Sequence, residues 1–410
     1  MASLPALSTQ TEGGVTVGYL GVHAAYQAAL TAAELGRLDC FYCSLLAAPG
    51  KWGGLISRVA GADRLASRRL SGLPLERVVE HPWPFLAERL HAWVGRGGAD
   101  RWLRACEAFD RWLANQLAAS RSRLIYGVDS CAEATFRQAS AMGMVRVAEC
   151  PGVHPKFMQG ILAETFGGSG QAYLAAPIPQ RKLRTYELAD VLVTHSAIHT
   201  RSFVTAGIPR DRIFECPLWV DPGLFHAEGR VPRPASGGRL RAVFAGRVNV
   251  LKGIPWLCDA LRRLQADVEL TVVGSADAKG RELLGRAPTN VTHRPPVTKA
   301  ELRAIYQRHD VLVLPSLMDT FGSVALEAMA CGLPVIVTDH CGVPVPDESW
   351  RVPVRDSDAI AGRLAMYAGD RARLARDAQA ALAFARQQTP AAFRQRLAAG
   401  FQAWGVEPRA

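Results

Sequence analysis

Short apolar runs alternate along this chain with longer stretches in which apolar residues recur at helical spacing. The short runs are typical of buried strands, and the longer stretches are typical of amphipathic helices. The pattern predicts strands over residues 15–21, 123–127, 145–148, 241–245, 268–273, 291–293, 310–314 and 334–338. It predicts helices over residues 24–35, 131–142, 254–264, 299–308 and 390–404, and a further helix that begins near residue 322. This alternation predicts an α/β fold in which parallel sheets are covered by helices on both faces.

A chain of 410 residues is long enough to form two domains that each bury a core. Residues 229–238 are rich in proline and glycine, which is typical of a linker. We therefore expect a first Rossmann-like, doubly wound domain over residues 1–228 and a second over residues 239–389. Two such domains that face each other across a hinge would form a ligand cleft.

One strand end in the second domain carries two carboxylates, and open α/β sheets bind ligands at such ends. Asp319 lies in the loop after the strand at residues 310–314, and Glu327 follows eight positions later inside a helix. The start of that helix presents free backbone N–H groups at its positive end. The residues that open it are Phe321, Gly322, Ser323 and Val324. Amides suit phosphates and carboxylates suit hydroxyls, so this segment predicts a site for a phosphorylated ligand that carries several hydroxyls.

A second segment with candidate chemistry follows the strand at residues 241–245. Gly246 makes the turn, and two cations five positions apart, Arg247 and Lys252, precede Gly253 and an apolar helix. Arginine can hold a diphosphate through two parallel hydrogen bonds, and lysine can hold it as a point charge. Two solvated loop cations explain this segment equally well when it is taken alone. Together with the acidic loop, it predicts a diphosphate site.

Both segments resemble the donor-site signatures of the retaining glycosyltransferases of family 4, which have the GT-B fold. In that family the acidic loop reads Glu-Gly-Phe-Gly, four residues, then Glu, and the cationic loop reads Gly-Arg, a few residues, then Lys-Gly. Here Asp319 stands where the first Glu is usual, and Thr320 stands where Gly is usual. Because aspartate is one methylene shorter, its carboxylate reaches roughly 1–1.5 Å less far, a difference that matters in catalysis. The resemblance extends over residues 186–401.

The resemblance implies a metal-independent enzyme that transfers a sugar from a UDP- or GDP-sugar to an acceptor hydroxyl, with retention at the anomeric carbon. It implies no cofactor besides the donor substrate. The acceptor would be a glycan, a lipid-linked molecule or a small molecule, and cell-surface polysaccharide synthesis is the expected setting. The helix within residues 390–410 would cross back to the first domain, as it does in this fold.

The resemblance also implies roles for individual residues of the second domain. Arg247 and Lys252 would bind the diphosphate, and Asp319 would bind hydroxyls of the transferred sugar. Glu327 would bind the ribose hydroxyls, and the nucleotide base would lie against the loop that contains Arg294. The backbone at Gly246 and at residues 321–324 would complete the donor site.

In the first domain the resemblance points to residues that follow strands. Gly21 and His23 would line the cleft, although a surface or helix-capping role is the alternative for His23. His154 is the candidate for the group beneath the anomeric carbon, and a plain loop histidine is the alternative. Glu149, at the end of the same strand, is a lesser candidate.

The formal net charge of +11 favours an acidic partner. No pattern typical of a nucleic-acid-binding module is present, so an anionic membrane surface or a lipid diphosphate fits better. Residues 56–77 form a basic amphipathic segment of the kind that contacts membranes, although a solvated helix face is the alternative. Scattered cysteines, with no signal peptide or long apolar run, favour a cytoplasmic protein. The basic amphipathic segment adds a peripheral position at the inner face of the plasma membrane as an option.

Two other classes of function remain open. A nucleotide-sugar isomerase on the same fold would need acid and base groups crowded into the cleft, and the sequence of the second domain shows no such set. A non-catalytic donor-binding or scaffold relative is compatible with the departures at Asp319 and Thr320. A Rossmann dehydrogenase is disfavoured because no Gly-x-Gly-x-x-Gly follows the first strand of either domain.

Overall fold

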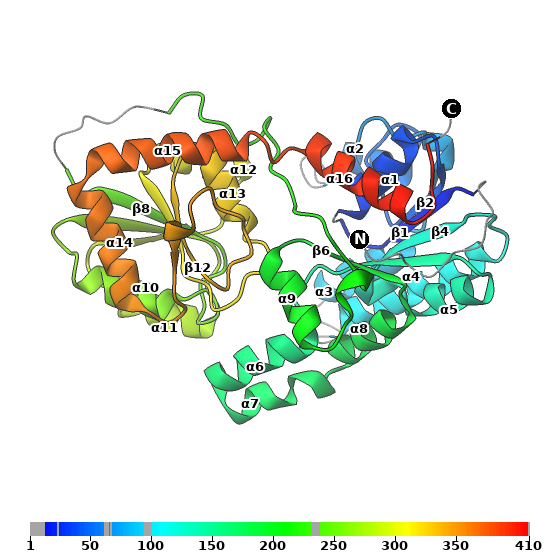
Figure 1. Cartoon of the computed structure of the whole chain (residues 1–410), viewed down its shortest axis with the longest axis horizontal. Helices are drawn as coiled ribbons and strands as arrows, with labels where there is room; N and C mark the ends of the chain where they lie inside the picture. The colour runs from blue at the N-terminus through cyan, green and yellow to red at the C-terminus, as the bar shows by residue number, and fades with distance from the viewer. Residues whose placement is uncertain are drawn as a thin grey trace. The chain divides into compact units, whose positions relative to one another are not determined.

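In the computed structural model of the chain, the structure describes residues 13–22, 24–60, 65, 68–93, 100–230 and 238–408. The chain divides into two compact units. The first unit contains Met1–His195, Thr200–Cys216 and Phe393–Ala410, and the second contains Ser196–His199 and Pro217–Ala392. Each unit is built on one parallel sheet with helices packed against it (Figure 1).

The first unit contains a seven-stranded sheet in the order β3-β2-β1-β4-β5-β6-β7, in which every neighbouring pair is parallel. Its strands are β1 (Val15–Tyr19), β2 (Leu38–Cys43), β3 (Val78–Glu80), β4 (Leu124–Val128), β5 (Val145–Glu149), β6 (Val191–Thr194) and β7 (Ile213–Glu215). Its helices are α1 (Ala25–Glu34), α2 (Trp52–Ala60), α3 (Trp83–Trp93), α4 (Arg101–Leu117), α5 (Glu133–Ala141), α6 (Pro155–Phe166), α7 (Gly168–Gln171), α8 (Pro177–Leu188) and α9 (Ala197–Thr205). The helix α16 (Pro390–Ala403) follows at the end of the chain.

The second unit contains a six-stranded parallel sheet in the order β10-β9-β8-β11-β12-β13. Its strands are β8 (Leu240–Ala245), β9 (Val268–Val273), β10 (Val291–Arg294), β11 (Val311–Leu314), β12 (Val335–Thr338) and β13 (Arg351–Val352). Its helices are α10 (Ile254–Arg262), α11 (Ala278–Gly285), α12 (Lys299–Gln307), α13 (Ser323–Ala330), α14 (Ser357–Gly369) and α15 (Arg371–Ala385). Helices α10, α11 and α14 lie on one side of this sheet, and α12, α13 and α15 lie on the other (Figure 1).

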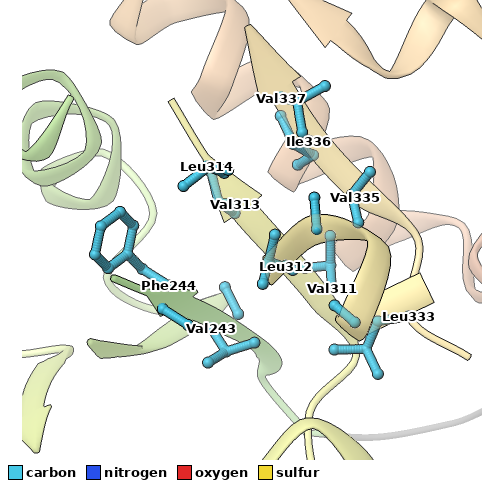
Figure 2. Packing of buried hydrophobic residues seen from close by; sticks show 14 of the residues in the cluster. Val243, Phe244, Val311, Leu312, Val313, Leu314, Leu333, Val335, Ile336 and Val337 are labelled. Carbon is cyan, nitrogen blue, oxygen red and sulfur yellow. The ribbon is translucent and has the colours of Figure 1, made fainter. Parts of the chain in front are cut away.

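The strand order explains the apolar runs of the sequence. A strand covered by helices on both faces buries every side chain, so it is apolar throughout rather than alternating. In β11 and β12 all residues are buried, and Figure 2 shows their side chains packed with Val243 and Phe244 of β8 and with Leu333. Both sheets have the doubly wound order, in which the chain leaves the first strand in one direction and later returns to its other side.

The division between the two units falls earlier than the linker that we predict at residues 229–238. The second unit begins at Pro217, because Val220 and Phe225 are buried in the core of the second sheet. Residues 217–228 look like loop in the sequence, and tertiary contacts, such as the packing of these two side chains, assign them to the second unit.

The end of the chain belongs to the first unit. Phe393, Leu397 and Phe401 of α16 are fully buried, and Phe401 packs edge-to-face on Tyr126 of β4. Trp404 packs in the same way on Phe214 of β7. The first unit therefore includes residues from both ends of the sequence. Within the described residues, no helix is long and apolar enough to cross a membrane.

Candidate active site

The order of the second sheet reverses between β8 and β11, and the two segments with candidate chemistry follow these two strands. β8 leads into residues 246–253, and β11 leads into the loop before α13. In doubly wound sheets the crevice outside this reversal is where ligands bind. The fold thus places side by side two loops that are about seventy residues apart in sequence. The ammonium of Lys252 lies 2.5 Å from Oδ2 of Asp319.

Glycines allow the loops to approach each other this closely. Gly253 has a φ of 76°, and a Cβ added there would lie 1.8 Å from the carbonyl oxygen of Pro315 in the other loop. A Cβ on Gly274, after β9, would lie 1.9 Å from the carbonyl oxygen of Gly246. No other residue fits at these crossings, and the left-handed φ of Gly253 also favours glycine. The turn before Gly253 is held by the backbone N–H of Lys252, which donates to Oδ1 of Asn249 at 2.9 Å.

Asp319 joins the cationic loop to the start of helix α13. Its Oδ2 accepts from Lys252, and its Oδ1 accepts from the backbone N–H of Gly322 at 2.9 Å. Its own backbone is held on both sides, since its N–H donates to the carbonyl of His340 and its carbonyl accepts from the N–H of Gly342. These partners fix the carboxylate and its backbone, so Asp319 is preorganised rather than free in a surface loop.

Glu327 lies on α13 and is almost fully buried, with 8% of its surface exposed. Its Oε1 lies 2.5 Å from the ammonium of Lys299, the first residue of α12. The same ammonium lies 5.2 Å from the centroid of the Phe225 ring. Within the described part of the chain, Oε2 of Glu327 has no hydrogen-bond partner, so this carboxylate retains an unused acceptor. Burial raises the pKa of Glu327, and Lys299 opposes that rise.

Lys299 is a member of the site that we do not predict from the sequence. One signal was available, because a lysine in the first turn of a helix opposes the helix dipole and is unfavourable there without a partner. Thr298 and Glu301 already form a capping box at this helix start. The partner of Lys299 lies 28 positions away on another helix, which no local pattern reveals.

The other predicted donor-site residues fall into two groups. Arg247, Arg294 and Ser323 have exposed side chains, whereas Phe321 is buried in the core of the second unit. Val324 is half-buried against the same core. The Phe321 side chain therefore anchors the loop, and only its backbone remains a candidate for ligand contact. The donor-site roles of these residues stay predictions.

His154 caps helix α6 in the first unit. Its Nδ1 accepts from the backbone N–H of Lys156 at 3.2 Å, and its ring packs against Tyr186 and Phe203. Burial lowers its pKa to about 4, so the ring is neutral near pH 7. These contacts give His154 a structural role, and its assignment beneath the anomeric carbon stays a prediction.

The remaining first-domain candidates are less informative. Glu149 is fully buried and accepts a hydrogen bond from the Tyr126 hydroxyl at 3.1 Å. Gly21 is buried after β1, and a Cβ there would lie 2.7 Å from the Tyr19 ring, so its close packing explains the glycine. His23 lies outside the described residues. In the described ranges no group of three His, Cys, Asp or Glu side chains is arranged to hold a metal ion.

Comparison with known proteins connects this geometry to a family. Residues 239–370 match the family described as Glycosyl transferases group 1. The match covers both loops that meet at Lys252 and Asp319, and it covers most of the second unit.

A named relative agrees with this match, and two solved structures share the fold. The chain is 37% identical over 171 residues to the D-inositol 3-phosphate glycosyltransferase of Paenarthrobacter aurescens, an overlap of 38% of this chain and 39% of that protein. The chain thus spans about two fifths of the length of this relative. It also resembles the structure of Anabaena HepE in complex with UDP and glucose, with a TM-score of 0.60 and 14% identity over 95% of this chain and 100% of that one. Sucrose-phosphate synthase from Thermosynechococcus elongatus gives a TM-score of 0.64 and 16% identity over 95% and 98%.

These structural neighbours confirm the predicted fold class. The chain has two Rossmann-like domains of the GT-B type, each with a parallel sheet and alternating helices. At this level of identity the neighbours establish the fold alone, so the activity rests on the site.

The Lys299–Glu327 pair gives a pH-dependent prediction. Folding raises the pKa of the Glu327 carboxyl above its value in the unfolded chain, which is about 4.3. Between these two pKa values the folded protein binds a proton that the unfolded chain has lost, so the free energy of unfolding falls as pH rises through this window. Lys299→Met removes the cation that lowers the pKa of Glu327. The pKa in the folded variant is then higher, so its free energy of unfolding continues to fall to higher pH. We expect the variant to lose roughly 1–2 kcal/mol relative to wild type near neutral pH, a discounted value because Lys299 is half exposed.

Thermal unfolding of both proteins from about pH 4 to pH 8 tests this, and the gap in Tm should widen with pH and then level off. Tyr306 and Cys331 also interact with Glu327, and both stay neutral over this range because burial raises the pKa of each. The matched control is Lys279→Met, since Lys279 is equally exposed and pairs with Glu282 on the surface of α11. A gap for Lys299→Met that is constant across the pH range contradicts the assignment.

Proposed function

We propose that this protein is a retaining, metal-independent glycosyltransferase that transfers a sugar from a UDP- or GDP-sugar to an acceptor hydroxyl. One observation carries the proposal. Two sequence segments that match a glycosyltransferase family meet at the strand reversal of the second sheet, where Lys252 and Asp319 lie 2.5 Å apart. The site combines cations, a helix start and two carboxylates, which is the chemistry that a nucleotide diphosphate sugar requires.

The cations and the helix start would stabilise the leaving diphosphate. Negative charge develops on it as the bond to the sugar breaks, and preorganised positive groups aimed at such charge usually contribute more to catalysis than any other single effect. Lys252 is held at the loop crossing by Asp319, and Arg247 extends from the same loop into solvent. The backbone N–H groups at the start of α13 add the positive end of a helix dipole. With these groups in place, no metal ion is needed to neutralise the diphosphate.

The carboxylates would orient the sugars. Asp319 lies beside the phosphate-binding cation, so hydroxyls of the transferred sugar are its natural ligands. Glu327 lies deeper on α13, and its buried Oε2, which has no partner among the described residues, would accept from the ribose hydroxyls after the carboxylate rotates to expose it. Arg294 ends β10, beside the loop where the base would lie. Retention requires the acceptor to approach on the face of the leaving group, and the departing diphosphate can then accept the proton of the acceptor hydroxyl.

For the acceptor we propose a hydroxyl on a glycan, on a lipid-linked molecule or on a small molecule, in cell-surface polysaccharide synthesis. The name of the Paenarthrobacter relative adds a phosphorylated polyol to the acceptors that merit testing. All nine cysteines are free, and eight of them are buried, which suits a protein that works in the reducing cytoplasm.

The test is nucleotide binding followed by transfer. With a chelator present, we expect UDP or GDP to raise the Tm, since a ligand at 100 times its Kd adds roughly 2.7 kcal/mol. Arg247→Ala should abolish the shift, and Arg286→Ala, an exposed arginine on the far end of α11 from this loop, should not. No shift with UDP, GDP, ADP or their sugars would contradict the proposal. Binding without transfer to any hydroxyl would instead identify a donor-binding subunit.

A further inference from the structure

Helices α2 and α3 of the first unit expose large apolar side chains in a group. Of the ten large apolar residues that are exposed in the described part of the chain, six lie between residues 52 and 93. We call five of them the tryptophan surface: Trp52, Leu55, Trp83, Leu90 and Trp93. Their exposed fractions run from 51% for Trp52 to 84% for Trp93. The sixth, Val79, lies on β3, and the remaining four, such as Phe166 and Leu224, come from elements outside residues 52–93.

The local structure makes this surface continuous. Glu80, at the end of β3, accepts from the backbone N–H groups of Trp52 at 2.6 Å and Gly53 at 3.1 Å, so it caps the start of α2. α3 begins three residues after Glu80, and the rings of Trp52 and Trp83 lie 6.2 Å apart between centroids. Along α3, Trp83 and Leu90 are seven positions apart and so share one face of the helix. The two helices thus present one apolar strip.

Such a strip is unfavourable in water unless something covers it. Scattered apolar residues are normal on a protein surface, whereas a contiguous group indicates a binding surface. These tryptophans contribute little to the core, because they remain mostly exposed although α3 packs on α4 and buries Pro84. A partner that covers this strip must therefore have an apolar interior, and its boundary with water must be able to hold tryptophan side chains.

The charge around the strip identifies the kind of occupant. Residues 51–93 contain seven lysines and arginines against four acidic residues. Of these groups, Arg68 is buried beside the Tyr26 and Ser44 hydroxyls and does not attract an anion. Two of the four acids are not available to repel one, because Glu80 caps α2 and Glu88 is mostly buried between Arg89 and Arg101. Arg77 and Arg89 are exposed, and Arg89 extends from α3 itself with 70% of its side chain in solvent. A basic rim around an apolar strip complements a surface that is anionic outside and apolar beneath.

We propose that the tryptophan surface binds the headgroup region of an anionic lipid bilayer. Tryptophan is favoured at such interfaces because its ring is apolar and its N–H remains hydrated. Basic side chains at the rim of an apolar helix face add attraction to anionic lipids. The helices would lie along the membrane surface rather than cross it. This inference goes beyond the proposed glycosyl transfer and does not depend on it, since it needs neither donor nor acceptor.

The experiment is co-sedimentation of the full-length protein with vesicles of phosphatidylcholine alone or mixed with phosphatidylglycerol. We expect binding to the mixed vesicles, weak binding to phosphatidylcholine, and release by salt. Trp83→Ser and Trp93→Ser should each weaken binding to mixed vesicles about tenfold. Arg89→Gln should weaken it about fivefold on anionic vesicles. Leu224→Ser, a comparably exposed apolar residue of the second unit, should leave binding unchanged.

Two results would overturn the proposal. One is equal binding by wild type and by the double variant Trp83→Ser/Trp93→Ser. The other is sedimentation velocity without lipid that shows a dimer dissolved by the same substitutions, together with no vesicle binding, since the strip would then join two copies of the chain. Trp93 is so exposed that its replacement will not unfold the protein, and equal Tm values for the variants verify this.

Discussion

Replacing Lys252 with alanine is expected to lower turnover by a hundredfold or more. The substitution removes a cation aimed at the charge that develops on the leaving diphosphate, and loss of one such group typically costs a factor of about 10²–10³. It also removes one of the two hydrogen bonds that the Asp319 carboxylate accepts within the described residues. Only the bond from the backbone N–H of Gly322 remains, so the carboxylate is less firmly oriented. Turnover measured with the nucleotide sugar identified by binding tests this expectation.

Lys279→Ala is the control, because Lys279 is a half-exposed lysine of the same domain that is ion-paired at the surface. It should retain wild-type turnover. Lys252→Arg should recover part of the activity, since the charge remains but the compact ammonium is replaced by a larger planar group. Turnover by Lys252→Ala that is close to wild type would remove Lys252 from the diphosphate site.

Replacing Asp110 with alanine is expected to destabilise the first domain by about 3–5 kcal/mol. Asp110 is fully buried on α4 and forms an ion pair with Arg181 of α8. It also accepts from the backbone N–H groups of Ala134 and Thr135, which begin α5. The substitution therefore removes a helix cap and leaves a buried guanidinium without its main partner, so a Tm lower by roughly 10 °C should follow.

Arg137→Ala is the control for this prediction. Arg137 pairs with Glu133 four residues away on α5, but most of its side chain is exposed. Exposed pairs of this kind contribute about 0.3–0.5 kcal/mol, so the Tm should barely change. If Asp110→Ala were no more destabilising than Arg137→Ala in calorimetry of the intact protein, the buried pair would not hold α4, α5 and α8 together.

The fold was predictable from the sequence because doubly wound sheets have apolar strands throughout. The predicted strand at residues 145–148 is observed as Val145–Glu149, and the one at 310–314 as Val311–Leu314. The strand β3 was not predictable, since it is three residues long and is defined only by pairing with β2. The division at Pro217 escaped prediction for a related reason, because it depends on which core two side chains enter.

The candidate site was predictable as two loops, but its internal pairing was not. Strand order brings the loops after β8 and β11 together, and the sequence indicates chemistry in each of them. The contacts Lys252–Asp319 and Lys299–Glu327 join residues 67 and 28 positions apart, and such pairs depend on tertiary structure alone. For His154 a local signal did exist, because Pro155 follows at the first position of a helix and marks His154 as its cap.

The return of α16 to the first unit has a consequence for how the protein is made. Most of the second unit is synthesised before the residues that finish the first, so the first sheet is made long before α16 can cover the apolar surface under Phe401 and Trp404. Deletion of the residues after 389 would therefore destabilise the first unit, although most of that unit lies at the other end of the sequence. Conversely, a fragment ending at Cys216 would need the missing helix supplied as a separate peptide, which makes the first domain a natural candidate for fragment complementation.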